Sequence, residues 1–209
     1  MTERVVIIAE AGVNHNGDIA TAKKLIEVAA AAGADYVKFQ TFKAETLVTA
    51  NAPKADYQKQ ANGASDQTQL EMLTSLELSK EHHIELMKHC RANQINFLST
   101  GFDTASLDLL FELGVRLFKV PSGELTNLPY LEHIAEFQCH VYLSTGMATL
   151  EEIKWAVEVL VAAGLPREKI SVLHCTTAYP TPTSQANLSA IRTLQKELQL
   201  PIGLSLIHI

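Results

Sequence analysis

Short apolar runs alternate with amphipathic segments along most of the chain. The apolar runs, rich in β-branched residues, occupy 5–9, 36–39, 95–98, 117–120, 141–143 and 170–173, and another begins at Pro201. Helix-like segments lie between them, at 19–32, 79–93, 103–113, 127–136, 149–163 and 187–199. The alternation predicts parallel strands, each followed by a helix that covers the sheet.

The segment 149–163 has the most complete helix signature. Thr149 and Glu152 have the spacing of a capping box, and Gly164 follows the last turn. One apolar stripe runs along the segment, formed by Leu150, Ile153, Val157, Leu160 and Val161.

Two α/β architectures fit this pattern, an open doubly wound sheet and a (β/α)8 barrel. No G-x-G-x-x-G follows the first apolar run, which weakens the dinucleotide-binding version of the open sheet. We therefore favour the barrel, with residues 1–209 as one domain. A complete barrel takes about 250 residues, so we expect an incomplete one of about six βα units plus a seventh strand.

Composition and charge exclude several classes of protein. The chain is 47% hydrophobic and 19% charged, with a formal net charge of −6. Such a chain buries a core and is not disordered, and it has no apolar run of about 18 residues that would span a membrane. The absence of a signal peptide and of a basic cluster favours a cytoplasmic protein that does not bind nucleic acid. Cys90, Cys139 and Cys175 are expected to be buried free thiols.

Charged and hydroxyl side chains gather where the predicted strands end. Lys38 and Lys119 lie inside strand segments, where a buried ammonium needs a partner. Each lysine either pairs with a carboxylate, Glu10 or Glu124, or binds an anion such as phosphate or a carboxylate. Two lysines at matching positions favour an anion site, to which further donors would come from Thr100, Ser122 and Ser144.

The carboxylates and histidines each allow two interpretations. Glu10 and Glu124 are either a general acid/base pair or counter-ions of the lysines. His15 caps a turn or contacts substrate, and His174 is expected to be a core histidine. We expect a solvated helix face for His82, His83 and His89. Tyr179 shapes a turn or contacts a sugar.

The segment 42–67 is long for a βα loop, which favours a lid or an insertion. We expect solvent exposure for its lysines, Lys43, Lys54 and Lys59.

Five strand-end motifs together closely resemble the N-terminal barrel of the sialic acid synthase family, which includes N-acetylneuraminate, legionaminate and pseudaminate synthases. The motifs are residues 8–17 (IAEAGVNHNG), 37–42 (VKFQTF), 118–124 (FKVPSGE), 143–147 (LSTGM) and 173–176 (LHCT). The resemblance extends in consistent order from about residue 5 to residue 205. The NHNG form is more similar to the neuraminate and legionaminate branches.

The resemblance implies a transferase that condenses phosphoenolpyruvate with an N-acetylated aldose, such as N-acetylmannosamine, releasing phosphate and making a nonulosonic acid. It also implies a divalent metal (Mn or Mg), a homodimer, and an antifreeze-like domain that is absent from residues 1–209. Phosphoenolpyruvate would be held by Lys38, Thr100, Lys119, Ser122, Ser144 and Ser205. Glu10, Gln40 and Tyr179 would contact the amino sugar, and Glu124 would position the attacking water or the sugar.

The chain departs from the family pattern at three places. Gly101 stands where the family usually has proline, and Thr177 where asparagine or serine is common. After Ser205 the family continues Asp-His-Thr with a metal-binding histidine, whereas Ile207 occupies that place here and His208 comes one position late. We therefore expect the metal ligands to be missing and the barrel to stop at its metal site.

Two other functions remain open. Lys119 would be a Schiff-base lysine in a pyruvate aldolase or lyase on the same barrel, which borohydride trapping with pyruvate would reveal. Alternatively, the chain is a non-catalytic fragment that binds anions.

The missing histidines generate a first prediction. We expect the purified chain to release little or no phosphate from phosphoenolpyruvate and N-acetylmannosamine. Metal-dependent phosphate release, followed with a colorimetric phosphate assay, would contradict it.

Overall fold

Parallel strands alternate with helices, as the apolar pattern predicted. The structure is a computed structural model that describes residues 4–49, 52 and 68–207. Its strands are β1 (Ile8–Gly12), β2 (Tyr36–Thr41), β3 (Asn96–Gly101), β4 (Leu117–Val120), β5 (His140–Ser144), β6 (Ile170–Cys175) and β7 (Ile202–Ser205). Its longer helices are α1 (Ile19–Ala31), α5 (Lys80–Ala92), α6 (Thr104–Glu112), α7 (Leu128–Glu136), α8 (Leu150–Ala162) and α9 (Ser189–Leu198). Short helices are α2 (Ala44–Leu47), α4 (Gln69–Thr74), η1 (Ser122–Glu124), η2 (Arg167–Lys169) and η3 (Thr183–Gln185).

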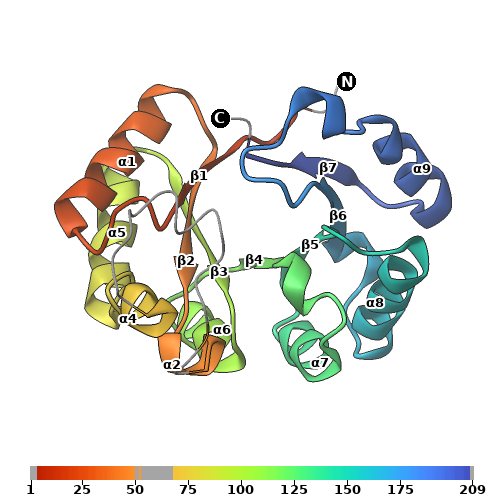
Figure 1. Cartoon of the computed structure of the whole chain (residues 1–209), viewed down its shortest axis with the longest axis horizontal. Helices are drawn as coiled ribbons and strands as arrows, with labels where there is room; N and C mark the ends of the chain where they lie inside the picture. The colour runs from red at the N-terminus through yellow and green to blue at the C-terminus, as the bar shows by residue number, and fades with distance from the viewer. Residues whose placement is uncertain (1–3, 50–51, 53–67, 208–209) are drawn as a thin grey trace. The chain divides into compact units, whose positions relative to one another are not determined.

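The chain divides into two units, Met1–Val115 and Arg116–Ile209. The first contains a sheet with the order β1-β2-β3, and the second a sheet with the order β4-β5-β6-β7. Every pairing in both sheets is parallel. Figure 1 shows α1 and α5 beside the first sheet, and α8 and α9 beside the second. These features confirm the α/β class.

Strand β2 forms the centre of the first sheet and sends alternate side chains to opposite faces. Val37 and Phe39 are fully buried and belong to a core that includes Ile26 of α1 and Leu86 of α5. Phe39 also stacks on Phe97 of β3, with 5.7 Å between ring centroids. The helices therefore cover this face, and the residues of β2 that alternate with Val37 and Phe39 lie on the other face.

The second sheet repeats this arrangement. Phe118, Val141 and Ile170 are partners in register across β4, β5 and β6, and all three are fully buried. Phe118 packs on Phe137, the residue that ends α7, with ring centroids 5.2 Å apart. This row marks the helix-covered face of the second sheet.

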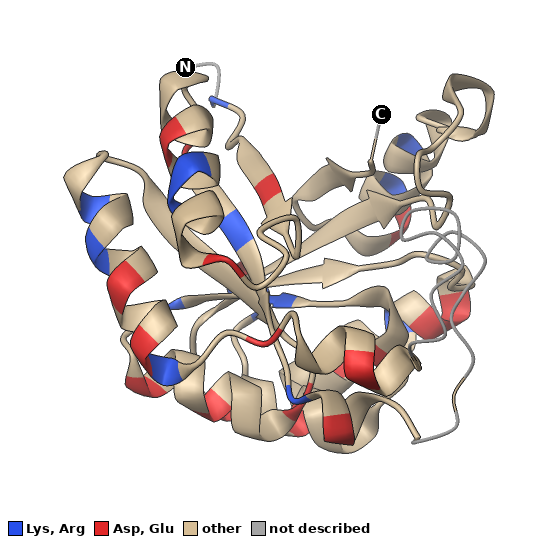
Figure 2. Ribbon diagram, turned by 60° about the vertical axis from the view of Figure 1, so that its left-hand side comes forward, with Lys and Arg blue, Asp and Glu red and all other residues tan. Residues whose placement is uncertain are grey.

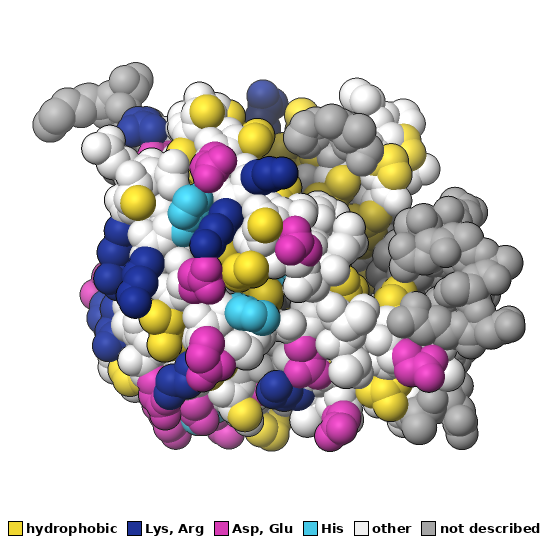
Figure 3. Space-filling view, turned by 90° about the vertical axis from the view of Figure 1, so that its left-hand side faces the viewer, with side chains coloured by type: hydrophobic (Ala, Val, Ile, Leu, Met, Phe, Trp, Pro, Cys, Tyr) yellow, Lys and Arg dark blue, Asp and Glu magenta, His cyan; other side chains and the backbone are white. Residues whose placement is uncertain are grey.

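Charged side chains lie mainly on the helices, and the strands carry few of them (Figure 2). Figure 3 shows acidic and basic side chains interleaved on the face that carries α1 and α5. Two side-chain contacts join these helices, an ion pair of Lys23 with Glu85 at 2.5 Å and a hydrogen bond of His89 Nε2 with Glu27 Oε1 at 3.0 Å. Because such pairs are partly solvated, they add little to the stability of the fold.

The capping box predicted at the start of α8 is confirmed. The backbone N–H of Thr149 donates to Glu152 Oε2 at 2.7 Å, and the N–H of Glu152 donates to Thr149 Oγ1 at 3.3 Å.

The predicted start of the first strand is wrong. The run 5–9 has the composition of a strand, but β1 begins at Ile8, whose partner is Tyr36, the first residue of β2. Val5 and Ile7 are 74% and 52% exposed. Strand pairing therefore overrides β-propensity here.

Several strands extend further than their apolar runs. Gln40 and Thr41 belong to β2, residues 99–101 to β3, and Ser144 to β5. Polar residues that follow an apolar run are usually predicted to form a loop, but here they continue the backbone hydrogen bonding of the parallel sheets. The candidate residues Gln40, Thr100 and Ser144 are therefore fixed by strand geometry and not by loops.

The expectation for the cysteines holds for two of the three. Cys90 and Cys139 are buried, and burial raises the pKa of the Cys90 thiol to about 12. Cys175 is only half-buried, because it lies at the end of β6. In the part of the chain that the structure describes, no helix combines the length and apolarity needed to cross a membrane.

Two glycines with the same backbone angle generate a stability prediction. Gly17 and Gly33 both have φ of +77°. A Cβ on Gly17 would lie 2.3 Å from the backbone oxygen of Ser75, whereas a Cβ on Gly33 meets nothing within 4 Å. We expect Gly33→Ala to lower the free energy of unfolding by about 1–2 kcal/mol, the cost of a left-handed alanine. Gly17→Ala should cost about 2 kcal/mol more, because the backbone must move.

Urea unfolding of the two variants at one pH measures this difference. Equal losses of stability would contradict the packing of the 14–17 loop against Ser75.

Candidate functional site

The first sheet places four of the candidate residues on one face. Glu10 is the register partner of Lys38, and Gln40 is the partner of Thr100. Lys38 and Gln40 alternate with Val37 and Phe39, so this face lies opposite the helix-covered one.

Lys38 is buried and forms an ion pair with Glu10. Its side chain is 10% exposed and that of Glu10 is 29% exposed. A buried ammonium needs such a partner, and Glu10 provides it. The pair also fixes both side chains at the same level of the sheet.

Two of the candidate hydroxyls have unsatisfied hydrogen-bonding capacity. Among the described residues, the buried side-chain polar atoms without a hydrogen-bond partner are Thr100 Oγ1, Ser144 Oγ and His15 Nε2. Leaving a buried hydroxyl unpaired costs about 1–3 kcal/mol, and proteins keep few of them. Both hydroxyls therefore have the property expected of groups that bind a ligand.

The second sheet also places candidate residues on one face. Lys119 is the register partner of Tyr142, and Ser144 lies two residues further along the same strand. Ser205 of β7 is the partner of Cys175 on β6 and shares this face. Each sheet thus combines a lysine with a hydroxyl that has no partner.

Ser122 is held in place by the loop that follows β5. The backbone N–H of Gly146 donates to Ser122 Oγ at 2.9 Å. A Cβ on Gly146 would lie 2.8 Å from that oxygen and 2.6 Å from Thr177 Cγ2. The position therefore requires glycine, and the methyl group of Thr177 packs closely against it.

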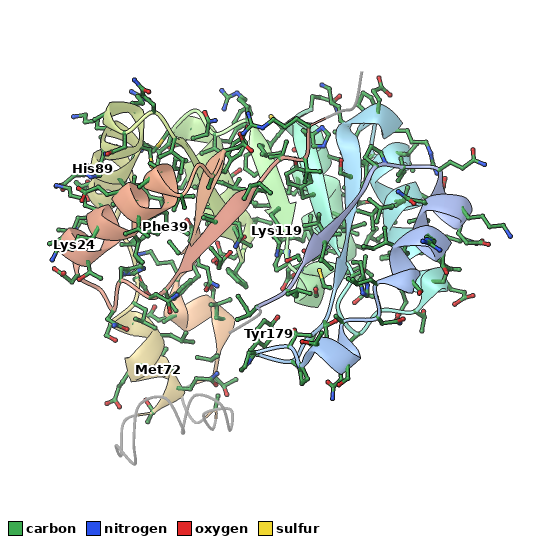
Figure 4. All side chains as sticks on the ribbon, turned by 90° about the horizontal axis from the view of Figure 1, so that it is seen from above. Lys24, Phe39, Met72, His89, Lys119 and Tyr179 are labelled. Atoms are coloured by element: carbon green, nitrogen blue, oxygen red, sulfur yellow. The ribbon has the colours of Figure 1, made fainter. Side chains whose placement is uncertain are left out.

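Glu124 and Tyr179 lie outside the strands. Glu124 belongs to η1, and its Oε2 accepts a hydrogen bond from Asn127 Nδ2 at 2.6 Å. Tyr179 is 55% exposed in the segment after β6, whereas Lys119 lies on β4 (Figure 4). The proposed acid/base pair is divided between units, because Glu10 belongs to the first and Glu124 to the second.

The histidine expectations have mixed outcomes. His15 caps its turn, because His15 Nδ1 accepts the N–H of Gly17 at 3.0 Å. His174 is a core histidine whose Nε2 bonds to the oxygen of Ala186 at 2.8 Å. The prediction of a solvated His83 is wrong, since this side chain is fully buried. His82 and His89 are partly exposed.

The buried His83 belongs to a polar cluster with Thr41 and Ser99 that sequence reasoning missed. A signal was present, since positions 83, 86 and 90 form the buried stripe of α5. Thr41 likewise continues the alternation of Val37 and Phe39 on the core face. Polar residues at such positions need buried partners.

The described residues do not fit the expected divalent metal. They bring together no group of three His, Cys, Asp or Glu side chains that would hold a metal ion. His208 lies outside the described residues, as do Lys54 and Lys59. Lys43 is described, and its exposed side chain pairs with Glu77 at 2.9 Å.

Burial lowers the pKa of three histidines. Desolvation is the main cause for His15, His83 and His140. Nearby basic groups lower the pKa further, chiefly His82 for the first two and Lys169 for His140. All three are therefore neutral at pH 7.

Comparison with solved structures defines the class of protein. The N-acetylneuraminic acid synthetase of Leptospira borgpetersenii, solved with citrate, matches 98% of this chain with a TM-score of 0.82 and 33% identity. The chain therefore has the TIM-barrel-like α/β fold of the sialic acid synthases, as predicted, and covers 65% of the Leptospira chain.

The chain belongs to the NeuB family, which matches residues 25–206. It is 52% identical to the N,N'-diacetyllegionaminic acid synthase of Campylobacter jejuni over 97% of its length. The enzyme of the same name from Legionella pneumophila is 48% identical over 95% of the chain. The chain spans 60% and 56% of the lengths of these two relatives.

The buried histidines generate a prediction on pH. As pH falls below 6.5, the ordinary histidine value, the unfolded chain binds protons before the folded chain does. The free energy of unfolding should therefore fall between about pH 6.5 and 5, by at most about 1.4 kcal/mol per pH unit for each buried histidine.

Urea unfolding at several pH values measures the slope. His83→Gln should reduce it, whereas Lys88→Gln, which replaces an exposed residue of the same helix, should leave it unchanged. A free energy of unfolding that stays constant over this range would contradict the burial of neutral histidines.

Proposed function

We propose that this chain carries the phosphoenolpyruvate-binding strand ends of a sugar-acid synthase, which joins phosphoenolpyruvate to an N-acetylated aldose and releases phosphate. The relatives support a legionaminic acid synthase more than other branches, because two N,N'-diacetyllegionaminic acid synthases are about half identical to the chain.

The observation that carries the proposal is the pairing of a lysine with an unpartnered hydroxyl in each sheet. Lys38 and Thr100 share one face of the first sheet, and Lys119 and Ser144 share one face of the second. A lysine and a hydroxyl on the same face of a sheet offer the donors that a phosphate or carboxylate group of phosphoenolpyruvate accepts from. Ser122 and Ser205 supply further hydroxyls at the ends of β4 and β7.

The size of the proposed second substrate follows from the number of carbons in the proposed product, a nonulosonic acid. A nonulosonic acid has nine carbons, three of which come from phosphoenolpyruvate. The partner is therefore a six-carbon aldose, and the N,N'-diacetyl form of the product requires two acetamido groups on it. Gln40 and Tyr179 carry the polar groups suited to hydroxyl and acetamido substituents.

The proposed reaction balances without a redox step. Carbon 3 of phosphoenolpyruvate bonds to the aldehyde carbon, whose oxygen takes up a proton, and positive charge develops at carbon 2. Water adds at carbon 2 and loses a proton, which leaves a hydroxyl there. The C–O bond to phosphate then breaks, and the hydroxyl gives up its proton to the departing phosphate and becomes the keto group. Carboxylates suit both the stabilisation of this charge and the activation of water, which is the role proposed for Glu10 and Glu124.

In this proposal Lys38 both pairs with Glu10 and donates to the anionic ligand. Its ion pair with Glu10 holds the ammonium on the ligand-facing side of the sheet, where it remains a donor for an anion.

Because Gly146 occupies one acceptor position of Ser122 Oγ, the proton of that hydroxyl is available to a ligand oxygen. The second domain, the homodimer, the metal and the cytoplasmic location remain predictions.

The proposal predicts that phosphoenolpyruvate binding depends on Lys38 and on Lys119. Lys38→Met and Lys119→Met should each weaken binding about 10- to 100-fold, because each removes a charge-assisted hydrogen bond. Isothermal titration calorimetry of the whole chain measures the affinity.

Lys24→Met is the matched control, since Lys24 is an exposed residue on the outer side of α1 (Figure 4). It should change the affinity less than twofold, and urea unfolding should confirm that each variant is folded. A folded wild-type chain that binds no phosphoenolpyruvate, or lysine variants that bind like wild type, would contradict the proposal.

A further inference from the structure

A buried row of hydrogen bonds joins α5 to the ends of β2 and β3. His83 Nδ1 lies 2.8 Å from the backbone oxygen of Ser79, and His83 Nε2 lies 2.7 Å from Thr41 Oγ1. Thr41 Oγ1 in turn lies 2.7 Å from Ser99 Oγ. His83 and Ser99 are fully buried, and Thr41 is 4% exposed.

The chemistry of these groups fixes the direction of every hydrogen bond. The oxygen of Ser79 only accepts, so His83 Nδ1 carries the proton and donates. The neutral imidazole then has an acceptor at Nε2, to which Thr41 donates its only hydroxyl proton. Ser99 must therefore donate to Thr41. The row has a single arrangement, in which each bond depends on the next.

His83 stays neutral inside this row. Burial is the main cause that lowers its pKa. The hydrogen bond with Ser79 acts in the opposite direction, and His82 on α5 and Lys43 after β2 lower the pKa further. The ring of Phe97 on β3 lies edge-on to the imidazole, with 6.1 Å between the ring centroids. A charged imidazole would instead donate from Nε2 to Thr41 Oγ1 and reverse the row, so neutrality sets its direction.

The row restrains the two residues proposed to face the ligand. Gln40 precedes Thr41 on β2, and Thr100 follows Ser99 on β3. Gln40 and Thr100 are register partners, and their side chains leave the sheet on the face opposite to the row. When Thr41 and Ser99 are held, the twist of both strand ends is set, and with it the direction of Gln40 and Thr100.

We propose that His83 is a positioning residue, which holds the ends of β2 and β3 through Thr41 and Ser99 and so orients Gln40 and Thr100. What these two side chains bind rests on the proposed function. The orientation itself does not.

The first test measures orientation without a ligand. Three-bond couplings give the χ1 rotamer of Thr100 by NMR in the full chain. We expect one rotamer in wild type and in His89→Leu, the matched control, which replaces a partly exposed histidine of α5 that contacts Glu27. His83→Leu should average the Thr100 rotamers, and His83→Gln, whose amide oxygen replaces the Nε2 acceptor, should restore part of the order.

A second variant tests the same proposal if His83→Leu does not fold. Thr41→Val keeps the shape of the side chain and removes only the hydroxyl, so it should average the Thr100 rotamers in the same way. Averaging in wild type, or one unchanged rotamer in both His83→Leu and Thr41→Val, would overturn the proposal.

The second test links orientation to binding. If wild type binds phosphoenolpyruvate, His83→Leu should weaken binding at least tenfold, His83→Gln should lie between, and His89→Leu should match wild type. An unchanged affinity in a folded His83→Leu chain would overturn the positioning role. A wild type that binds nothing would contradict only the proposed function, and the rotamers of Thr100 would then decide the role of His83.

Discussion

The alternation of side chains along β2 is the constraint on which the first unit depends. Because β2 pairs with β1 and β3 on its two sides, its twist and register fix both neighbours. One set of its residues builds the core with α1 and α5, and the other set carries Lys38 and Gln40. A slip of one residue would exchange the two sets, burying charge in the core and exposing Phe39. Core packing and the candidate site are therefore products of one register.

The second sheet also has one face packed in the core and one face that carries candidate residues. Its helix-covered face holds rows such as Phe118, Val141 and Ile170, and its other face holds Lys119 and Ser144. Each unit thus uses core packing to hold a lysine and a hydroxyl on strands, which are more rigid supports than loops. The hydroxyls without partners lower stability slightly, as is common where a protein keeps groups for a ligand.

The sequence allowed the fold class, the order of strands and helices, and most candidate residues to be predicted, because apolar periodicity and strand-end chemistry are local signals. It did not reveal where strands end, since Gln40, Thr41 and Ser144 look like loop residues until the ladder is seen. It also misplaced His83, because the helix around it is polar and only the stripe with Leu86 and Cys90 marks the buried face. A hydrogen bond between distant residues, such as that of Thr41 with Ser99, depends on the register of the two strands and cannot be predicted from either segment alone.

The central claim is that the two faces of β2 and β3 have separate tasks, one in the core and one toward the ligand. NMR titration of the full chain, labelled at threonine methyl groups, with phosphoenolpyruvate tests it most directly. The account predicts that the Thr100 methyl signal shifts with the ligand while that of Thr41, on the opposite face, stays in place. A shift of Thr41 with an unchanged Thr100 would contradict it.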